Sequence, residues 1–482
     1  MPKASLHLNK FQFRRRPPNQ NRAYAPMLDL AITGFTLALL VLGFRRPFIW
    51  VLAYLYIDIL APQKISYHLL SSLPISLIAF VLAFGGWLLI DPKLDSRFTL
   101  RQGLIAVLLI YCGMTTLSAD FPDQALAKWS WVWKALVFAV FLPLTLRTRL
   151  RIEAAALVMV LAVGAIIIDG GIKTVGGGGG YGELHLFIND NTGLYEGSII
   201  STVAIAVIPL ILWLMQHGTI FPPDWRVKAF GLALIFACAL MPVGTQARTG
   251  LLCLALLAVL ALRNVKRRAV YIAVMAVLAL IAVPLLPDSF TKRMSTIENH
   301  QSDQSAATRV AVWGWTLDYV KDHPLGGGFA AYLSNRVHVE LKGQSGDGNN
   351  VSVETKDAFD KARAYHSSYF EMLGEQGWPG LFLWLWLMLS GLWQMERIRH
   401  RWKNRGGPGE TWQASLATAL QQSLIVYMAG SLFVGIAFQP FCYMLIGLQC
   451  GLWSYLKRIE AAAPRAVAIP HQLIVPHAVA AE

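Results

Sequence analysis

The sequence predicts an all-α polytopic membrane protein with about twelve transmembrane helices and one large polar loop domain. Of its 482 residues, 55% are hydrophobic and 15% are charged, whereas about 25% of the residues of an average soluble domain are charged. Long apolar runs recur along the chain, and short connectors rich in arginine and lysine separate many of them. Together these observations favour a bundle of membrane-crossing helices.

About thirteen apolar runs are long enough, or nearly long enough, to cross a hydrocarbon core of about 30 Å. They begin near Leu28, Pro47, Leu73, Gly103, Ser130, Glu153, Thr192, Ala229, Thr249, Ala269, Pro379, Ser415 and Gly435. The first run lies between two arginine clusters, 14–16 and 45–46, that both favour the cytoplasm. It is therefore either re-entrant or an unusual crossing, and we expect twelve true spans with both termini inside.

The charge pattern predicts how the protein is oriented in the membrane and which molecules its basic residues contact. The net charge of +14 raises the question of nucleic acid, but the basic residues gather in the short connectors. This is the positive-inside pattern, and it predicts contact with anionic lipid headgroups and no nucleic acid. The polar insertion near residues 288–378 instead carries more acidic than basic residues, which places it on the non-cytoplasmic side.

Five parts follow from this layout. They are a basic cytoplasmic N-terminus (1–26), an N-terminal transmembrane helix bundle (27–286), a polar catalytic loop domain (287–378), C-terminal transmembrane helices (379–456) and a disordered cytoplasmic tail (457–482). The loop domain is the expected place for chemistry, because functional residues concentrate on loops that a rigid scaffold holds.

Several familiar kinds of site are missing from the sequence. The five cysteines lie in apolar runs without paired spacing, so we interpret them as core residues and not as disulfides or metal ligands. The chain has no Asp-x-Asp pair, zinc-protease, serine-hydrolase or P-loop signature. We therefore predict no cofactor and no metal, and a metal-dependent transferase that uses soluble nucleotide sugars is disfavoured.

Four polar groups fall on the same predicted membrane face: Arg248, the cluster 189–191, Arg309 and His366. Arg248 begins a span at the outer surface, where an arginine that merely reaches headgroups would oppose the positive-inside trend. Its guanidinium can bind phosphate oxygens through two hydrogen bonds. The residues alone therefore favour a functional role for Arg248.

Arg309 and His366 have simpler alternatives. Arg309 precedes an amphipathic helical pattern that stops at His323–Pro324, and by itself it is best explained as a solvated loop charge. His366 opens a predicted helix with Tyr369, Phe370 and Leu373 on one face, ended by Gly377 and Pro379. Such a surface histidine is usually incidental, but it is also the side chain best suited to accept a proton near neutral pH.

Three segments resemble the bacterial O-antigen ligase and O-antigen polymerase superfamily. They are Gln246–Gly250, then Arg309 with Trp313 and the run 322–328, and then His366–Tyr369 with 375–380. Ala247 stands where the family usually has serine, and Ser367 where it usually has asparagine. The N-terminal half, with Arg45–Arg46–Pro47 and the glycine-rich connector that begins at Gly176, also resembles a subgroup of O-glycosylation ligases associated with exosortase systems.

This resemblance implies transfer of a glycan from undecaprenyl diphosphate to an acceptor hydroxyl, on the periplasmic face of the bacterial inner membrane, without nucleotide or metal. It implies catalytic roles for His366 as general base and for Arg248 and Arg309 as diphosphate-binding groups. Tyr365, Glu375 and Asn191 are further candidates for substrate binding.

The acceptor is left open by the sequence. We rank lipid A-core first, because the loop domain falls late in the chain. A protein hydroxyl in a protein O-oligosaccharyltransferase comes second, and the growing glycan of an O-antigen or exopolysaccharide polymerase comes third. A transporter of lipid-linked sugars is the alternative from another class, and it predicts that His366 and the loop domain are dispensable.

Overall fold

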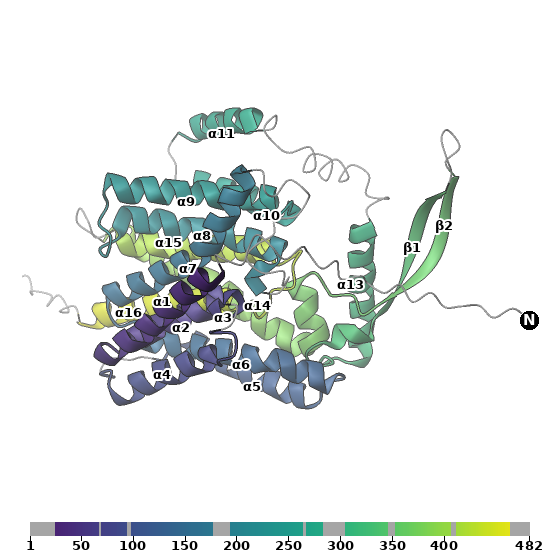
Figure 1. Ribbon diagram of the computed structural model, residues 1–482, viewed down its shortest axis with the longest axis horizontal. Coiled ribbons are helices and arrows are strands. Elements are labelled where there is room, and N and C mark those ends of the chain that lie inside the picture. Colours follow the sequence, from purple (N-terminus) through teal and green to yellow (C-terminus); the bar gives the residue numbers. More distant parts are fainter. Residues whose placement is uncertain are drawn as a thin grey trace, which may run out of the picture.

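The computed structural model describes residues 25–66, 69–93, 98–176, 193–263, 267–282, 304–345, 352–405 and 411–462. The N-terminal part is a succession of helices that run roughly parallel to one long direction of the molecule (Figure 1). They are α1 (Ala25–Arg45), α2 (Phe48–Leu60), α3 (Pro62–Ile65), α4 (Ile75–Leu89), α5 (Leu100–Leu117), α6 (Pro122–Thr145), α7 (Arg149–Val175), α8 (Gly197–His217), α9 (Trp225–Gly244), α10 (Arg248–Leu262) and α11 (Arg268–Ala282).

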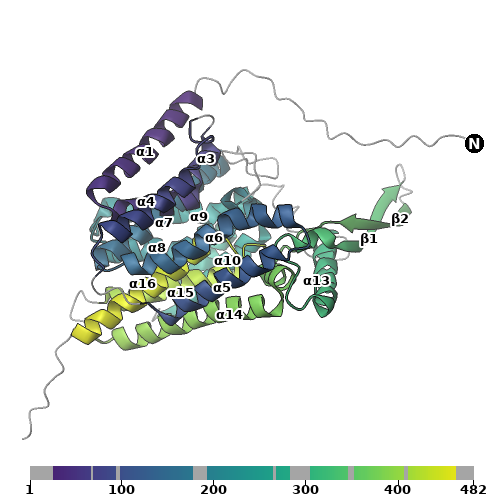
Figure 2. The same ribbon diagram turned by 90° about the horizontal axis from the view of Figure 1, so that it is seen from below.

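The C-terminal part begins with the polar domain and returns to the bundle. Helix α13 (Gln304–Asp322) is followed by strands β1 (Arg336–Ser345) and β2 (Ser352–Lys361), which pair antiparallel from Arg336 opposite Lys361 to Ser345 opposite Ser352. Helices α14 (Ser368–Trp402), α15 (Trp412–Gly430) and α16 (Pro440–Ala462) complete the bundle. Figure 2 shows α13 and the hairpin together at one end of the molecule.

Each of the apolar runs recognised in the sequence coincides with a helix. Six described helices (α1, α5, α6, α7, α8 and α9) are long and apolar enough to cross a membrane, which supports a multi-pass membrane protein. The twelve expected crossings stay a prediction. Helix α2 has 13 residues, or about 20 Å of helix, which is too short to cross a hydrocarbon core of about 30 Å.

The bundle has one contiguous apolar core to which helices α1 to α10 and α14 to α16 contribute. Arg101 of α5 lies inside this core and donates to the Leu387 carbonyl of α14 at 3.2 Å and to Gln449 Oε1 of α16 at 2.9 Å. Burying a guanidinium is costly unless it is hydrogen-bonded, so these bonds fix how α5, α14 and α16 pack. The five cysteines are buried and free, which confirms that they are core residues.

The structure adds three details that the sequence pattern did not give. Among the described residues, the largely helical chain contains one two-stranded hairpin. Helix α14 begins at Ser368 and not at His366, with Ser367 as its N-cap. Gly377 kinks this helix without ending it, because the chain resumes a helical course through Pro379.

Candidate functional site

The glycine-rich run after α13 packs directly against the kink of α14. Gly377 has φ of +63°, a left-handed conformation in which a Cβ is strained, and a side chain there would also collide with the Pro324 carbonyl oxygen. The Gly327 N–H donates to the Gly374 carbonyl at 3.0 Å, and the Trp378 N–H donates to the Pro324 carbonyl at 3.0 Å. These contacts explain the glycines of both motifs as the means of joining the polar domain to α14.

The same glycine-rich run is also held by hydrogen bonds to α5 and to the loop between α5 and α6. Gly327 accepts a hydrogen bond at 2.9 Å from the Asp120 N–H, and the Asp120 carboxylate accepts one from the Tyr319 hydroxyl. Tyr111 of α5 donates to the carbonyls of Leu325 and Gln376, each at 3.0 Å. The polar domain therefore has a fixed position on α5, α6 and α14.

His366 lies at the junction between the polar domain and α14. Its φ of +48° is uncommon for a non-glycine residue, and such strain is often found at functional sites. Neighbouring residues hold it: Trp313 Nε1 of α13 donates to the Tyr365 carbonyl at 2.8 Å. On the other side, the Ser368 N–H donates to the Ser431 carbonyl at 2.8 Å. The imidazole is exposed while its backbone is clamped.

Three charged groups act on this imidazole. Partial desolvation by the surrounding protein lowers the pKa of His366 below its ordinary value. Arg309 and Arg363 lower this pKa further, and Glu196 opposes them. The exposed edge of the ring and the lowered pKa together describe a neutral imidazole that solvent or a substrate can reach. Such a group can accept a proton near neutral pH.

Arg309 is placed by α13. It lies inside this helix, one turn before Trp313, whose indole stacks on Phe370 of α14 with ring centroids 4.9 Å apart and planes 4° apart. This stacking fixes the face of α13 that carries Arg309 against the start of α14. The side chain that looked most like a solvated loop charge thus has a defined position beside His366.

Arg248 is the first residue of α10, as the sequence predicted. Gln246, two residues earlier, has φ of +52°, a second uncommon left-handed conformation. The Thr245 and Ser201 hydroxyls share a hydrogen bond of 2.7 Å, which joins the chain before α10 to α8. Helix α8 begins beside its N-cap Glu196, whose charge acts on His366. Arg248 and His366 therefore lie at the same end of the bundle.

Of the three residues predicted to bind substrate, one lies outside the described residues and two are buried. Asn191 lies outside the described residues. Tyr365 is buried, with its ring in edge contact with Tyr332 at 5.9 Å, and its hydroxyl lies against Gly374. Glu375 is 1% exposed. Burial gives Tyr365 and Glu375 evident structural roles, and their roles in substrate binding stay predictions.

A buried ion cluster holds the first turns of α14, and the sequence analysis missed it. Lys128 of α6 contacts Glu371 at 2.6 Å and Glu375 at 2.7 Å. The second Glu375 oxygen accepts from the Ala330 N–H at 3.0 Å, and the second Glu371 oxygen accepts from the Ala437 N–H at 3.0 Å. The available signals were Lys128 near the start of an apolar run and two glutamates four residues apart on one helix face.

Glu196 and Arg363 are also functional candidates that the motifs did not identify. Both became visible only because the fold brings the start of α8 and the end of the hairpin toward His366. No group of three or more histidine, cysteine, aspartate or glutamate side chains that could hold a metal ion occurs among the described residues.

Two family models match the chain. Residues 27–219 match a family of unknown function, DUF5935, and residues 232–385 match the O-Antigen ligase family. The comparison with curated proteins found no match. The second region contains Arg248, Arg309 and His366, and the resemblance of the N-terminal half to the exosortase-associated subgroup stays a prediction. The chain is thus a multi-pass membrane protein whose residues 232–385 match the O-antigen ligase family model.

Proposed function

We propose that this protein transfers a glycan from undecaprenyl diphosphate to an acceptor hydroxyl, most favourably on lipid A-core, at the periplasmic face of the inner membrane. The observation that carries the proposal is the exposed, clamped His366 beside Arg309, with a lowered pKa, inside the region that matches the O-antigen ligase family model. A neutral imidazole suits a general base, and nearby guanidinium groups suit an anionic leaving group.

In the proposed reaction, His366 accepts the proton of the acceptor hydroxyl as its oxygen attacks the anomeric carbon of the donor sugar. The bond from this carbon to the diphosphate oxygen breaks, and undecaprenyl diphosphate leaves with the electron pair. Arg248 and Arg309 bind the diphosphate and stabilise the charge that develops on it. Attack opposite to the leaving group inverts the configuration of the anomeric carbon. The step needs no nucleotide and no metal.

The scaffold supports this reaction by positioning the groups. The Lys128–Glu371–Glu375 cluster fixes the first turns of α14, and the Trp313–Phe370 stack fixes α13 beside them. Arg309 lies on α13 itself, and His366 lies two residues before the first residue of α14. Holding reacting groups in place in this way removes orientational cost from the chemical step.

The proposal is tested in a host strain that lacks this protein, by restoring either the wild type or His366→Ala. Lipopolysaccharide is separated on a gel while lipid-linked glycan is quantified. We expect the wild type alone to restore the ladder and His366→Ala to accumulate carrier-bound polymer. His323→Ala is the matched control, because His323 lies in the same domain and stacks on Tyr319 at 4.3 Å, away from the proposed site.

The other outcomes separate the alternatives. Short chains of a single repeating unit in the knockout would assign a polymerase. An unchanged ladder with loss of glycan from secreted proteins would assign a protein O-oligosaccharyltransferase. A normal ladder with His366→Ala would remove the general-base role, and the transporter alternative, which predicts that His366 is dispensable, would then be favoured.

A further inference from the structure

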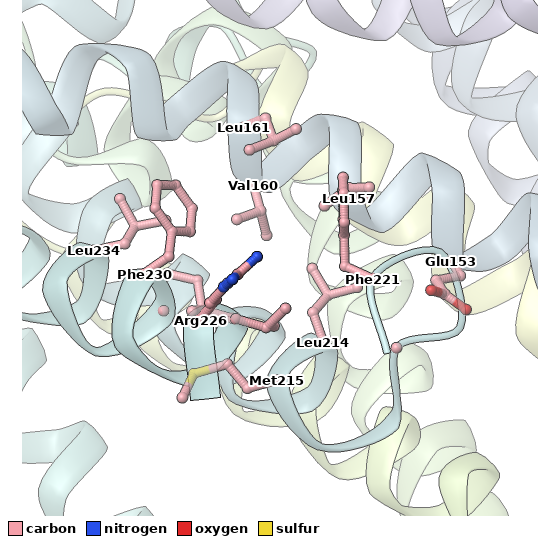
Figure 3. Close-up of a pocket in the computed structure, with 14 residues that line it drawn as sticks. Glu153, Leu157, Val160, Leu161, Leu214, Met215, Phe221, Arg226, Phe230 and Leu234 are labelled. Carbon is pink, nitrogen blue, oxygen red and sulfur yellow. The ribbon is translucent and has the colours of Figure 1, made fainter. Parts of the chain in front are cut away.

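An apolar cavity of about 380 Å³ lies between α7, α8, α9 and the loop that joins α8 to α9 (Figure 3). Hydrocarbon side chains form nearly all of its wall, among them Leu157, Val160, Leu214, Phe230 and Leu234. A cavity of this size is within the range of small-molecule sites. Its lining chemistry suits a hydrocarbon chain.

Two charged residues line this cavity, and their side chains have different surroundings. Glu153 is buried, and its carboxylate accepts hydrogen bonds from the backbone N–H of Ile220 at 2.7 Å and from Thr219. Arg226 is exposed, and Figure 3 shows its guanidinium directed into the cavity. Within the described part of the chain, Arg226 forms no ion pair, and its guanidinium lies 5.6 Å from the Trp225 ring. The cavity thus offers one positive charge at an apolar wall.

The apolar surface continues beyond this cavity along the seam between α7 and α9. A second cavity of about 550 Å³ shares Phe230 and Leu234 with the first and extends to Leu240. The span from Arg226 to Leu240 is about 21 Å at a rise of about 1.5 Å per residue. One leaflet contributes about 15 Å of hydrocarbon. The seam is therefore long enough to hold one extended acyl chain.

The charged end of the seam is remote from the proposed transfer site. Arg226 lies in the first turn of α9, whereas Arg248 follows the last turn of this helix. The nearby connectors of the bundle carry further basic residues, such as Arg149, which donates to the His217 carbonyl at 2.9 Å. A basic helix end at the membrane surface attracts anionic headgroups.

We propose that the α7–α9 seam binds one anionic glycerophospholipid, with an acyl chain in the two cavities and its phosphate at Arg226. Charge complementarity selects this occupant, because a zwitterionic lipid brings no net charge to the guanidinium. The proposal is independent of the transfer reaction. It assigns the seam to a bound lipid and not to the glycan donor, whose diphosphate belongs at the other end of α9.

The test is native mass spectrometry of the full-length protein released from nanodiscs that contain equal amounts of phosphatidylglycerol and phosphatidylcholine. We expect the wild type to retain one phosphatidylglycerol in preference to phosphatidylcholine. Arg226→Gln should reduce this preference by about five-fold, the effect of one basic residue near a lipid surface. Val160→Trp should reduce the retention of both lipids, because the indole occupies the cavity.

Arg397→Gln is the matched control. Arg397 is also an exposed arginine over a tryptophan, 5.2 Å from the Trp393 ring, but it does not line the α7–α9 seam. Its preference should equal that of the wild type. An unchanged preference in Arg226→Gln, or unchanged retention in Val160→Trp, would overturn the proposal. Displacement of phosphatidylglycerol by an equal amount of a polyprenyl phosphate, or a lipid-free dimer of this chain, would also overturn it.

Discussion

The pKa of His366 depends on charges from three different parts of the chain. Arg309 and Arg363 are positive and lower its pKa, whereas Glu196 is negative and raises it. If this imidazole is the general base, the acid limb of kcat/KM follows its pKa in the free protein. The neighbours can therefore be tested separately from the base itself.

We expect substitutions of these neighbours to move the acid limb in opposite directions. Arg363→Gln removes a positive charge, so the pKa of His366 rises and the limb moves to higher pH. Glu196→Gln removes the opposing negative charge, so the pKa falls and the limb moves to lower pH. The measurement is the rate of transfer between about pH 5 and 8, the range where histidine titrates. Shifts of the same sign in both variants would contradict the placement of these charges.

Arg248 is expected to require its forked guanidinium. Arg248→Lys keeps the positive charge but loses the paired hydrogen bonds to a diphosphate, so transfer should fall by about ten-fold or more. Steady-state rates with the purified protein check this. Lys228→Arg, a change near the opposite end of α9, serves as the control. Full activity in Arg248→Lys would mean that a point charge is sufficient.

At the level of the helices, the ion cluster between α6 and α14 should contribute strongly to the stability of the fold. Lys128→Met leaves the buried carboxylates of Glu371 and Glu375 without their cation. Breaking a buried ion pair typically costs about 3–5 kcal/mol. We expect a clear fall in the thermal unfolding temperature in detergent. Lys321→Ala, which breaks the exposed contact with Asp318 at 2.7 Å, should leave it unchanged. Equal effects of the two changes would contradict a structural role of the cluster.

The kink of α14 gives a second test at this scale. Gly377→Ala introduces a Cβ at φ of +63° against the Pro324 carbonyl, which should cost about 1–3 kcal/mol and detach the glycine-rich run. Thermal unfolding and transfer rate should both fall. Gly314→Ala is the control, because Gly314 lies in α13 with no atom near the added Cβ. A Gly377→Ala protein as stable as wild type would contradict the packing described for this kink.

Sequence periodicity predicted helices better than it predicted the site. Every long apolar run became a helix, because a membrane-spanning backbone must satisfy its own hydrogen bonds. The apolar run that begins near Thr249 also predicted that Arg248 lies at a helix start, and Arg248 is the first residue of α10. Along β1, Val337, Val339 and Leu341 alternate with polar residues as in a half-buried strand, but the hairpin was missed because β2 has only Val353 and Phe359 in the matching pattern. Lys128 and Glu196 were missed as neighbours of α14 and His366, because their partners are distant in sequence.

Over the whole bundle, the two ends carry different groups. One end carries His366, Arg309 and Arg248. The other carries basic helix ends and the mouth of the apolar seam at Arg226. This division suits a protein that works on a headgroup at one membrane surface while it is anchored at the other.

In the proposed reaction, this chain breaks the bond between a glycan and its diphosphate carrier and uses His366 as the general base. The most direct measurement combines purified protein, lipid-linked glycan and acceptor in the presence of a metal chelator, with mass spectrometry of both products. We expect the wild type to release one undecaprenyl diphosphate for each new glycosidic bond. His366→Ala should still bind the donor and release none. Product from His366→Ala at the wild-type rate, or donor moved across a vesicle membrane without bond cleavage, would rule out this reaction.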